Sequence, residues 1–481
     1  MWTEGNPPPW QQGTRRDFLA QFGGVALAAL LSRDGLLAAG GPASPASPPP
    51  PFAARAKAVI QIFCPGGLSH VDTWDYKPEL ERCHGQPFDA ELGKQTFAGV
   101  AGNYARGFWP FRQHGQCGRW ISDLFPRLAG HVDGMAFIHS MQSKSALHGP
   151  AMFMMNSGFI RPGFPAMGSW VTYGLGSEND NLPAFVVLPD PRGLPPGGVS
   201  NWGAGFLPAR HQGTVLETAA GKAPFADLFP AEAVPSDAER DGRDFLRKLN
   251  AAHAAARADS LLDARIASYE LAARLQLSAP EAVDIAAETD ATRRLYALAD
   301  ADAGPFGRQC LLARRLVERG VRFVQIFCGA ENTSSKLIRP NWDSHEDIVR
   351  DHGYWGRVLD TGAGALLTDL RGRGLLDSTL VMCTTEFGRQ PFMQGKQKGR
   401  DHNPGAFTAW LAGGGIKGGT GYGASDDHGW KAAGRATFCY DLHATALHLL
   451  GIDHEKLTFY QNGIQRRLTD VHGQVIREVI V

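Results

Sequence analysis

Short apolar runs alternate with segments of helical periodicity along most of this chain. Each run ends at polar or turn-forming residues, which is typical of buried strands. The predicted strands lie at 58–63, 135–139, 182–188, 321–327, 379–383 and 407–411, and the predicted helices at 149–156, 310–318, 360–373 and 442–450. This alternation predicts an α/β fold, a three-layer sandwich whose mostly parallel central sheet is covered by helices on both faces.

The middle of the chain departs from this alternation. Residues 190–235 are rich in Pro and Gly and predict a long surface excursion. From about 242 to 301 the apolar spacing becomes helical, starting with Phe245, Leu246 and Leu249. We expect a helical insertion there.

The N-terminus carries a pattern of export rather than of folding. Thr14-Arg15-Arg16-Asp17-Phe18-Leu19 precedes the soft apolar run 22–31, which is the twin-arginine export pattern. That run is shorter than the roughly 20 residues that span a bilayer, and a Pro/Ser/Ala linker follows it. We therefore expect a signal and linker over 1–51, one domain over 52–481, no stable membrane span in the mature chain, and a periplasmic or extracellular location.

Charge and cysteine content narrow the function classes. Lys+Arg and Asp+Glu both number 48 among 481 residues, which gives no case for a nucleic-acid or anionic-membrane partner. The seven cysteines contain no Cys-x-x-Cys pair, so a zinc ribbon or thioredoxin-like site is not expected. Cys64, Cys328 and Cys383 lie at the ends of apolar runs and are interpreted as buried small hydrophobes. Cys83 and Cys117 could form one disulfide in an oxidising compartment.

Polar clusters follow the predicted strands. Carboxylates and imidazoles recur just after strand ends, and in a parallel sheet these ends meet at one edge. Mixed Asp, Glu and His ligands suit Zn, Mn, Mg or Ca. The candidate metal ligands are Asp72, Asp343, His345, Glu386, Asp401 and His402.

Two further features would suit an anion. His148 opens the helix after the second strand, and the backbone N–H groups of a helix start favour an anion or an attacking oxygen. Arg389 and Arg400 flank the carboxylates and could clamp a phosphate or sulfate. The alternative for both arginines is a solvated surface or a salt bridge.

Several segments resemble known enzymes. The stretches 374–388 and 441–452 resemble conserved stretches of sulfatases, and 148–158 resembles the sulfatase nucleophile helix. The segments 66–75, 167–179, 386–389, 399–402 and 467–470 resemble the bacterial domain-of-unknown-function family 1501, a sulfatase-like family within the alkaline phosphatase superfamily. The resemblance implies an alkaline-phosphatase-like fold and one or two divalent metal ions. It also implies an anionic ester substrate, for which a sulfated glycan is one candidate.

The resemblance carries over unevenly to the ligands. Asp72 lies several residues later than the first metal aspartate of the superfamily. Asp343 and His345 resemble its Asp-x-x-x-His pair with shorter spacing, and Glu386 stands in place of the aspartate of Asp-His. Phe387 replaces the histidine of that pair. The resemblance implies that His402, with Asp401, restores the lost imidazole.

The nucleophile position differs most. His148 stands where sulfatases have Cys or Ser, and no Cys-x-Pro-x-Arg occurs. Three routes stay open: His148 attacks or ligates metal, Ser143 or Ser145 serves, or a water molecule activated by the metal attacks. The chain is thus expected to be an exported metal-dependent hydrolase of sulfate or phosphate esters. The alternative is a non-catalytic exported binding or surface-assembly protein on the same scaffold.

Overall fold

A computed structural model describes residues 52–88, 101–179, 181–218, 236–255, 281–331 and 341–481. They fall into two compact units. The larger one carries the fold described below, and the other includes helix α6 (Ser236–Ala255). The twin-arginine segment and the linker lie outside the described residues, as does 256–280 of the expected helical insertion. The domain limits thus stay predictions.

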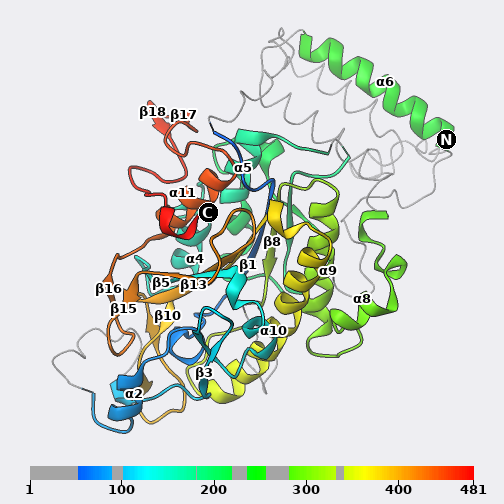
Figure 1. Cartoon of the computed structure of the whole chain (residues 1–481). Coiled ribbons are helices and arrows are strands. Elements are labelled where there is room, and N and C mark those ends of the chain that lie inside the picture. The colour runs from blue at the N-terminus through cyan, green and yellow to red at the C-terminus, as the bar shows by residue number, and fades with distance from the viewer. Residues whose placement is uncertain (1–51, 89–100, 180, 219–235, 256–280, 332–340) are drawn as a thin grey trace, which may run out of the picture. The chain divides into compact units, whose positions relative to one another are not determined.

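A central sheet of eight strands organises the larger unit (Figure 1). Its order is β14-β5-β13-β9-β1-β8-β6-β7. Five neighbouring pairs are parallel, and β13 is antiparallel to both of its neighbours. The strands are β1 (Ala58–Phe63), β5 (Met135–Met141), β6 (Phe185–Leu188), β7 (Thr214–Val215), β8 (Phe323–Phe327), β9 (Thr379–Thr384), β13 (Phe407–Ala412) and β14 (Thr420–Tyr422). The predicted mostly parallel sheet is confirmed.

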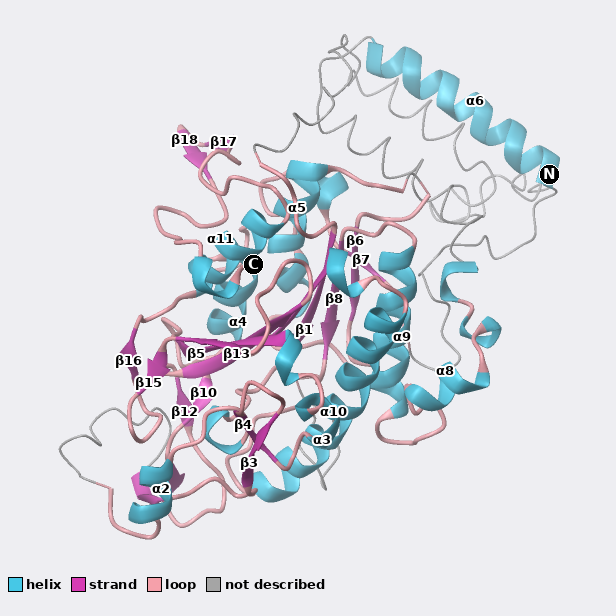
Figure 2. Cartoon of the chain, viewed as in Figure 1, coloured by secondary structure: helices cyan, strands magenta, loops and turns pink. Residues whose placement is uncertain are grey.

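Helices cover both faces of the sheet (Figure 2). Strands β1, β8 and β9 are buried along their whole length, which explains their unbroken apolar runs. Alternate residues such as Val59 and Phe327 pack into one core cluster with α4 (His148–Ser157), α5 (Met167–Leu175) and α11 (Cys439–Leu449). The other face carries α9 (Gly304–Glu318) and α10 (Ile348–Gly372). The three-layer α/β sandwich is confirmed.

Among the element limits that differ from the prediction, two have a local physical cause. Helix α10 begins at Ile348 rather than near 360, because the Asp347 side chain accepts a hydrogen bond from the Arg350 N–H and caps the first turn. Glycines in that first half hide its apolar periodicity. Strand β6 begins after Pro183, which has no N–H for the ladder.

Short elements complete the larger unit. Five two-stranded sheets and three short helices lie in the connections between the main elements. The strands are β2 (Ala101–Tyr104) with β11 (Phe392–Gln394), β3 (Phe111–His114) with β4 (Arg119–Ser122), β10 (Gly388–Arg389) with β12 (His402–Asn403), β15 (Ala424–Ser425) with β16 (Ala432–Gly434), and β17 (Phe459–Gln461) with β18 (Ile464–Arg466). The helices are α2 (Pro78–Cys83), α3 (Pro126–Ala129) and α8 (Asp290–Leu295).

The predicted disulfide is wrong. All seven cysteines are described, and all are free thiols. Cys83 is buried at the end of α2 in a small cluster with Val71 and Leu80. Cys117 is exposed in the turn between β3 and β4, where its backbone N–H bonds to Asp133. Within the described ranges, none of the helices combines the length and the apolar content that crossing a membrane requires.

Candidate metal centre

The polar cluster expected at strand ends forms at the carboxyl edge of β1, β8 and β9. The loop after β1 passes against the loop that carries Asp343. Gly66 has φ +110°, and a Cβ there would stand 2.4 Å from the backbone nitrogen of Asp343. Only glycine allows this close approach of two backbones. The loop after β9 supplies Glu386, and β12 supplies His402.

One carboxylate oxygen is the centre of the cluster. Oδ1 of Asp343 lies 2.8 Å from Nε2 of His345 and 3.1 Å from Nε2 of His402. Nε2 of His148 lies 3.4 Å from the same oxygen. Three imidazoles from three separate chain segments therefore present the same ring atom to one carboxylate.

The far side of each imidazole ring has its own partner. Nδ1 of His402 lies 2.7 Å from the carbonyl oxygen of Ala146. A carbonyl only accepts, so this Nδ1 carries the hydrogen and, in the neutral ring, Nε2 carries the lone pair. The partners of the other two rings are Glu386 for His148 and Gln394 for His345. Partners of this kind orient histidines that ligate metals.

The donor set fits a divalent cation. Ligands about 2.1 Å from one ion are roughly 3.0–3.4 Å apart, close to the spacings around Asp343. Two overlapping triplets have ligand atoms that all lie within 4.8 Å of one another: His148, Asp343 and His402, and His345, Asp401 and His402. Nε2 of His148 is buried and makes no hydrogen bond to any described residue. A cation would satisfy it.

Charge holds the cluster together without a metal. Burial alone raises the pKa of the Asp343 carboxyl, but the charge of Arg389 and the polar contacts with the three histidines bring it well below its usual range. Burial lowers the pKa of His148, yet Asp343 and Glu386 outweigh it and raise this pKa to about 9. Burial, together with the charges of Arg389 and His148, lowers the pKa of His402 to about 4. A proton on His148 and a cation at its Nε2 would therefore compete.

Glu386 stands behind His148 rather than among the converging atoms. Its Oε1 lies 2.7 Å from Nδ1 of His148 and accepts a hydrogen bond from the N–H of Gly66, also at 2.7 Å. Its Oε2 accepts from the Thr385 hydroxyl. We therefore assign Glu386 to the orientation of His148, not to direct ligation as the sequence suggested.

Asp72 and Arg400 form a separate buried ion pair. Both side chains are fully buried, with Arg400 Nε 2.9 Å from Asp72 Oδ2. Arg400 also donates to the carbonyls of Gln390, Ala105 and Arg106. Arg400 is therefore bound to Asp72 and to backbone carbonyls and does not face a substrate. The Asp72 carboxylate points toward Arg400. Neither residue belongs to the candidate centre.

Arg389 faces the cluster, and its guanidinium binds residues of the cluster and nearby backbone. Its Nη2 lies 2.6 Å from Asp343 Oδ1, and its other hydrogen bonds go to backbone carbonyls, including those of Gly67 and Arg400. The side chain is completely buried. Arg389 therefore neutralises Asp343, and its buried guanidinium is held by Asp343 and backbone carbonyls rather than presented to an ester.

The other predicted residues lie around the cluster. Asp401 accepts a hydrogen bond from the His402 N–H, and its Oδ1 lies 3.8 Å from Nδ1 of His345. Ser145 bonds to the backbone of Leu147 in a local turn. The Ser143 hydroxyl accepts only from the Ser145 N–H among the hydrogen bonds seen. Neither serine hydroxyl bonds to a ligand atom of the cluster.

Sequence reasoning missed three contributors. Gln394, the Ala146 carbonyl and Gly66 hold the site in place, and of these only Gly66 lies in a segment that resembles the family, 66–75. A residue pattern cannot identify a backbone carbonyl as a partner. Gly66 alone carried a signal, as part of the tight Pro-Gly-Gly loop after the first strand.

Comparisons with known proteins were made for the whole chain. The sequence model of a family described as "Protein of unknown function (DUF1501)" matches residues 56–480. No curated protein matches.

Solved structures of low identity are similar to the chain. The PsFucS1 sulfatase from Pseudoalteromonas sp. is 13% identical, with 93% of this chain and 73% of that chain covered and a TM-score of 0.32. The phosphonate monoester hydrolase SpPMH from Silicibacter pomeroyi is 12% identical, with 73% and 71% covered and a TM-score of 0.35. An alkaline phosphatase from the Antarctic bacterium TAB5 is 10% identical, with 76% and 94% covered and a TM-score of 0.30. At these values the similarities carry no argument about activity or substrate.

Proposed function

The chain belongs to the DUF1501 family, and we propose that it is an exported, metal-dependent hydrolase of phosphate or sulfate esters. One observation carries the proposal: Nε2 atoms of three oriented histidines converge on Oδ1 of Asp343. The motifs that resemble sulfatases, in 374–388 and 441–452, support the reaction class. The twin-arginine pattern at 14–19 supports export to the periplasm or beyond.

We assign the ion to His148, Asp343, His345 and His402, with Asp401 beside them. Imidazole and carboxylate ligands suit Zn or Mn, and Mg or Ca less well. When bound, a divalent ion would polarise the ester and lower the pKa of nearby water. Glu386 and Gln394 keep two of the rings turned toward Asp343. This pre-organisation removes the cost of ordering the ligands when the ion arrives.

The start of α4 is the candidate anion site. Leu147 at the N-cap supplies no side-chain cap, so the first N–H groups of the helix keep their capacity to donate. Nothing lies within 4 Å of the position that a Cβ of Gly149 would take. The oxygens of a phosphate or sulfate group would bind there, next to His148. A sulfated glycan is the substrate class that the sulfatase resemblance suggests.

A specific observation favours the alternative, a non-catalytic binding or surface-assembly protein. No serine, threonine or cysteine side chain among the described residues is seen to bond to a proposed ligand atom, and the Thr385 hydroxyl contacts only the supporting carboxylate of Glu386 in this cluster. Cys328, the thiol nearest in sequence to Asp343, is fully buried, and burial raises its pKa. Hydrolysis therefore requires a water molecule, or His148 itself, as the attacking group.

Hydrolysis assays separate the two functions. We expect p-nitrophenyl phosphate or p-nitrophenyl sulfate to be hydrolysed by the purified protein supplied with Zn²⁺ or Mn²⁺. H402A should lower kcat/KM by at least about a hundredfold, roughly 2.7 kcal/mol, while H84A, at an exposed histidine, should keep it. Metal binding without turnover of either ester, in the presence of each ion, would favour the binding protein.

A further inference from the structure

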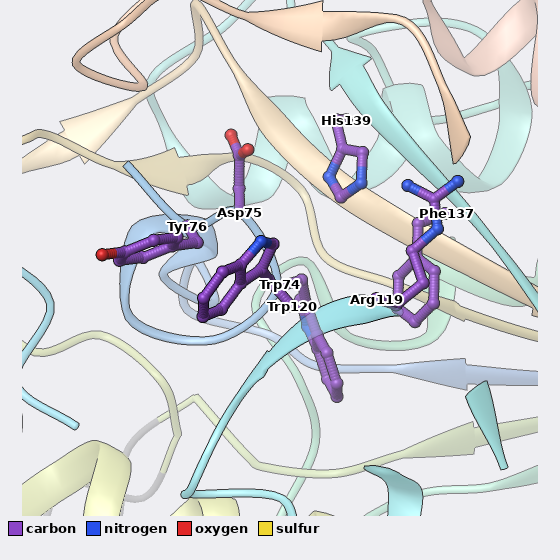
Figure 3. A pocket seen from close by; sticks show the side chains of 7 residues that line it. All are labelled: Trp74, Asp75, Tyr76, Arg119, Trp120, Phe137 and His139. Atoms are coloured by element: carbon purple, nitrogen blue, oxygen red, sulfur yellow. The ribbon is translucent and has the colours of Figure 1, made fainter. Parts of the chain in front are cut away.

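A pocket that shares no residue with the metal centre opens beside β4 and β5. Its volume is about 100 Å³. It is lined by the loop 74–76, by Arg119 and Trp120 of β4, and by Phe137 and His139 of β5 (Figure 3). Nothing in the proposed hydrolysis uses these side chains.

The mouth of the pocket is aromatic. Trp120 is 41% exposed although it is a large apolar side chain. Its ring centroid lies 4.7 Å from that of Tyr76, which in turn lies 5.2 Å from that of Phe111. The neighbouring rings hold Trp120 in place, so that little side-chain freedom is lost on binding. An exposed, supported indole face suits the C–H face of a sugar ring.

A buried donor in the pocket lacks a partner. Trp74 is 2% exposed, and its Nε1 makes no hydrogen bond to any residue in the described ranges. The ring stacks on Phe125 with centroids 4.2 Å apart, which fixes where the N–H points. A buried N–H without an acceptor is destabilising, so the pocket favours a ligand that supplies an acceptor.

The charge around the pocket is positive on balance. The Asp75 carboxylate is paired with Lys77 at 3.1 Å and accepts from Ser425. Arg119 forms no ion pair with a described carboxylate, and its hydrogen bonds to the Gly419 carbonyl are long, at 3.4 Å. Its guanidinium therefore keeps donor capacity for an anionic ligand.

His139 adds no charge at neutral pH. Burial lowers its pKa to about 4, and its Nδ1 lies 3.2 Å from the Thr408 hydroxyl. The unpaired charge of the pocket is thus that of Arg119 alone. One negative charge on the ligand would balance it.

We propose that this pocket binds a uronic acid, a sugar whose ring carries one carboxylate. The carboxylate accepts from Trp74 Nε1 and from Arg119, and the ring rests on Trp120. The volume holds the carboxylate end, and the exposed indole takes the rest of the sugar outside it. No bond is made or broken, and the inference does not rest on the proposed hydrolase activity.

Isothermal titration of the purified protein with D-glucuronate tests the proposal. We expect saturable binding, at least tenfold weaker binding of D-glucose, which lacks the carboxylate, and at least tenfold weaker binding of acetate, which lacks the ring. W120A and R119Q should each weaken glucuronate binding at least tenfold. W74F keeps the stacked ring but removes the donor, and should weaken it about fivefold.

Two matched control variants change residues that do not line the pocket. R112Q removes an arginine from the partner strand of the same hairpin, and Y460A removes an exposed aromatic from β17. Both should bind glucuronate within twofold of the unchanged protein. Absence of glucuronate binding, equal binding of acetate or glucose, or a folded W120A and R119Q with unchanged affinity would each overturn the proposal. Thermal melting establishes that the variants are folded.

Discussion

Nδ1 of His148 lies 2.7 Å from Oε1 of Glu386, whose side chain is completely buried. A carboxylate in this position sets the orientation of the ring and leaves Nε2 to face Asp343. The pair thus resembles the carboxylate–histidine arrangements that support metal ligands. In the proposed metal centre, Glu386 would be a positioning residue and His148 the group that touches the ion.

Replacing Glu386 should weaken metal binding without abolishing it. We expect E386Q to raise the Kd for Zn²⁺ about 10- to 100-fold, the range typical of such supporting partners. Glutamine keeps an acceptor for the Gly66 N–H, so the fold should persist. Competition with a chromophoric chelator measures the Kd. If E386Q lost all bound metal, as D343N should, Glu386 would be a ligand after all.

Breaking the Asp72–Arg400 pair should affect stability rather than metal content. D72N leaves the fully buried Arg400 without its charged partner, and such a loss typically costs about 3–5 kcal/mol. Urea unfolding should show this decrease, while elemental analysis should show the metal content of the unchanged protein. D377N, at an exposed aspartate, is the matched control. Loss of metal from a folded D72N would restore Asp72 to the ligand set.

Gly66 should not tolerate a side chain. In G66A the new Cβ would meet the backbone of Trp342 and Asp343 at 2.4–2.8 Å, in a φ region that favours glycine. Strain and overpacking together should destabilise the protein by roughly 3 kcal/mol and displace Asp343. G85A, where φ is also positive but nothing lies within 4 Å, controls for φ alone. Equal effects of the two variants on metal affinity would refute the close-approach argument.

Buried histidines should make the protein sensitive to acid. His443 is buried, its Nε2 lies 2.9 Å from the Met155 carbonyl, and burial lowers its pKa to about 4. Because the unfolded value is near 6.5, its contribution is complete above pH 6.5. It is lost as the pH falls toward 4, by on the order of 3 kcal/mol.

H443Q keeps a donor but removes the titration. Its free energy of unfolding should therefore fall less between pH 7 and pH 4.5 than that of the unchanged protein, as urea unfolding at each pH would reveal. H84Q, at an exposed position, should follow the unchanged protein. Parallel pH curves for H443Q and the unchanged protein would contradict the assignment.

The fold could be predicted where burial on both faces requires a continuous run of apolar residues. Strands β1, β8 and β9 are apolar throughout because both faces are covered, so their limits could be predicted closely. The direction of β13 was not predictable, because the run 407–411 has the same apolar pattern in either orientation. Pairing with β5 and β9 settles it.

The site was predictable in part for a similar reason. The rule that ligands follow strand ends identified Asp343, His345 and His402, which do converge. It equally selected Asp72, because a carboxylate can serve either in a buried ion pair, as Asp72 does with Arg400, or as a metal ligand. Only their three-dimensional partners distinguish the two roles.

The central claim is that Asp343 and the histidines around it hold a divalent cation. Elemental analysis of the protein after incubation with Zn²⁺, Mn²⁺, Mg²⁺ or Ca²⁺ and removal of free ions tests it most directly. We predict about one tightly bound ion per chain, lost in folded D343N and H402A and retained in D377N. A metal-free protein under all four conditions, or a folded D343N with undiminished metal, would contradict it.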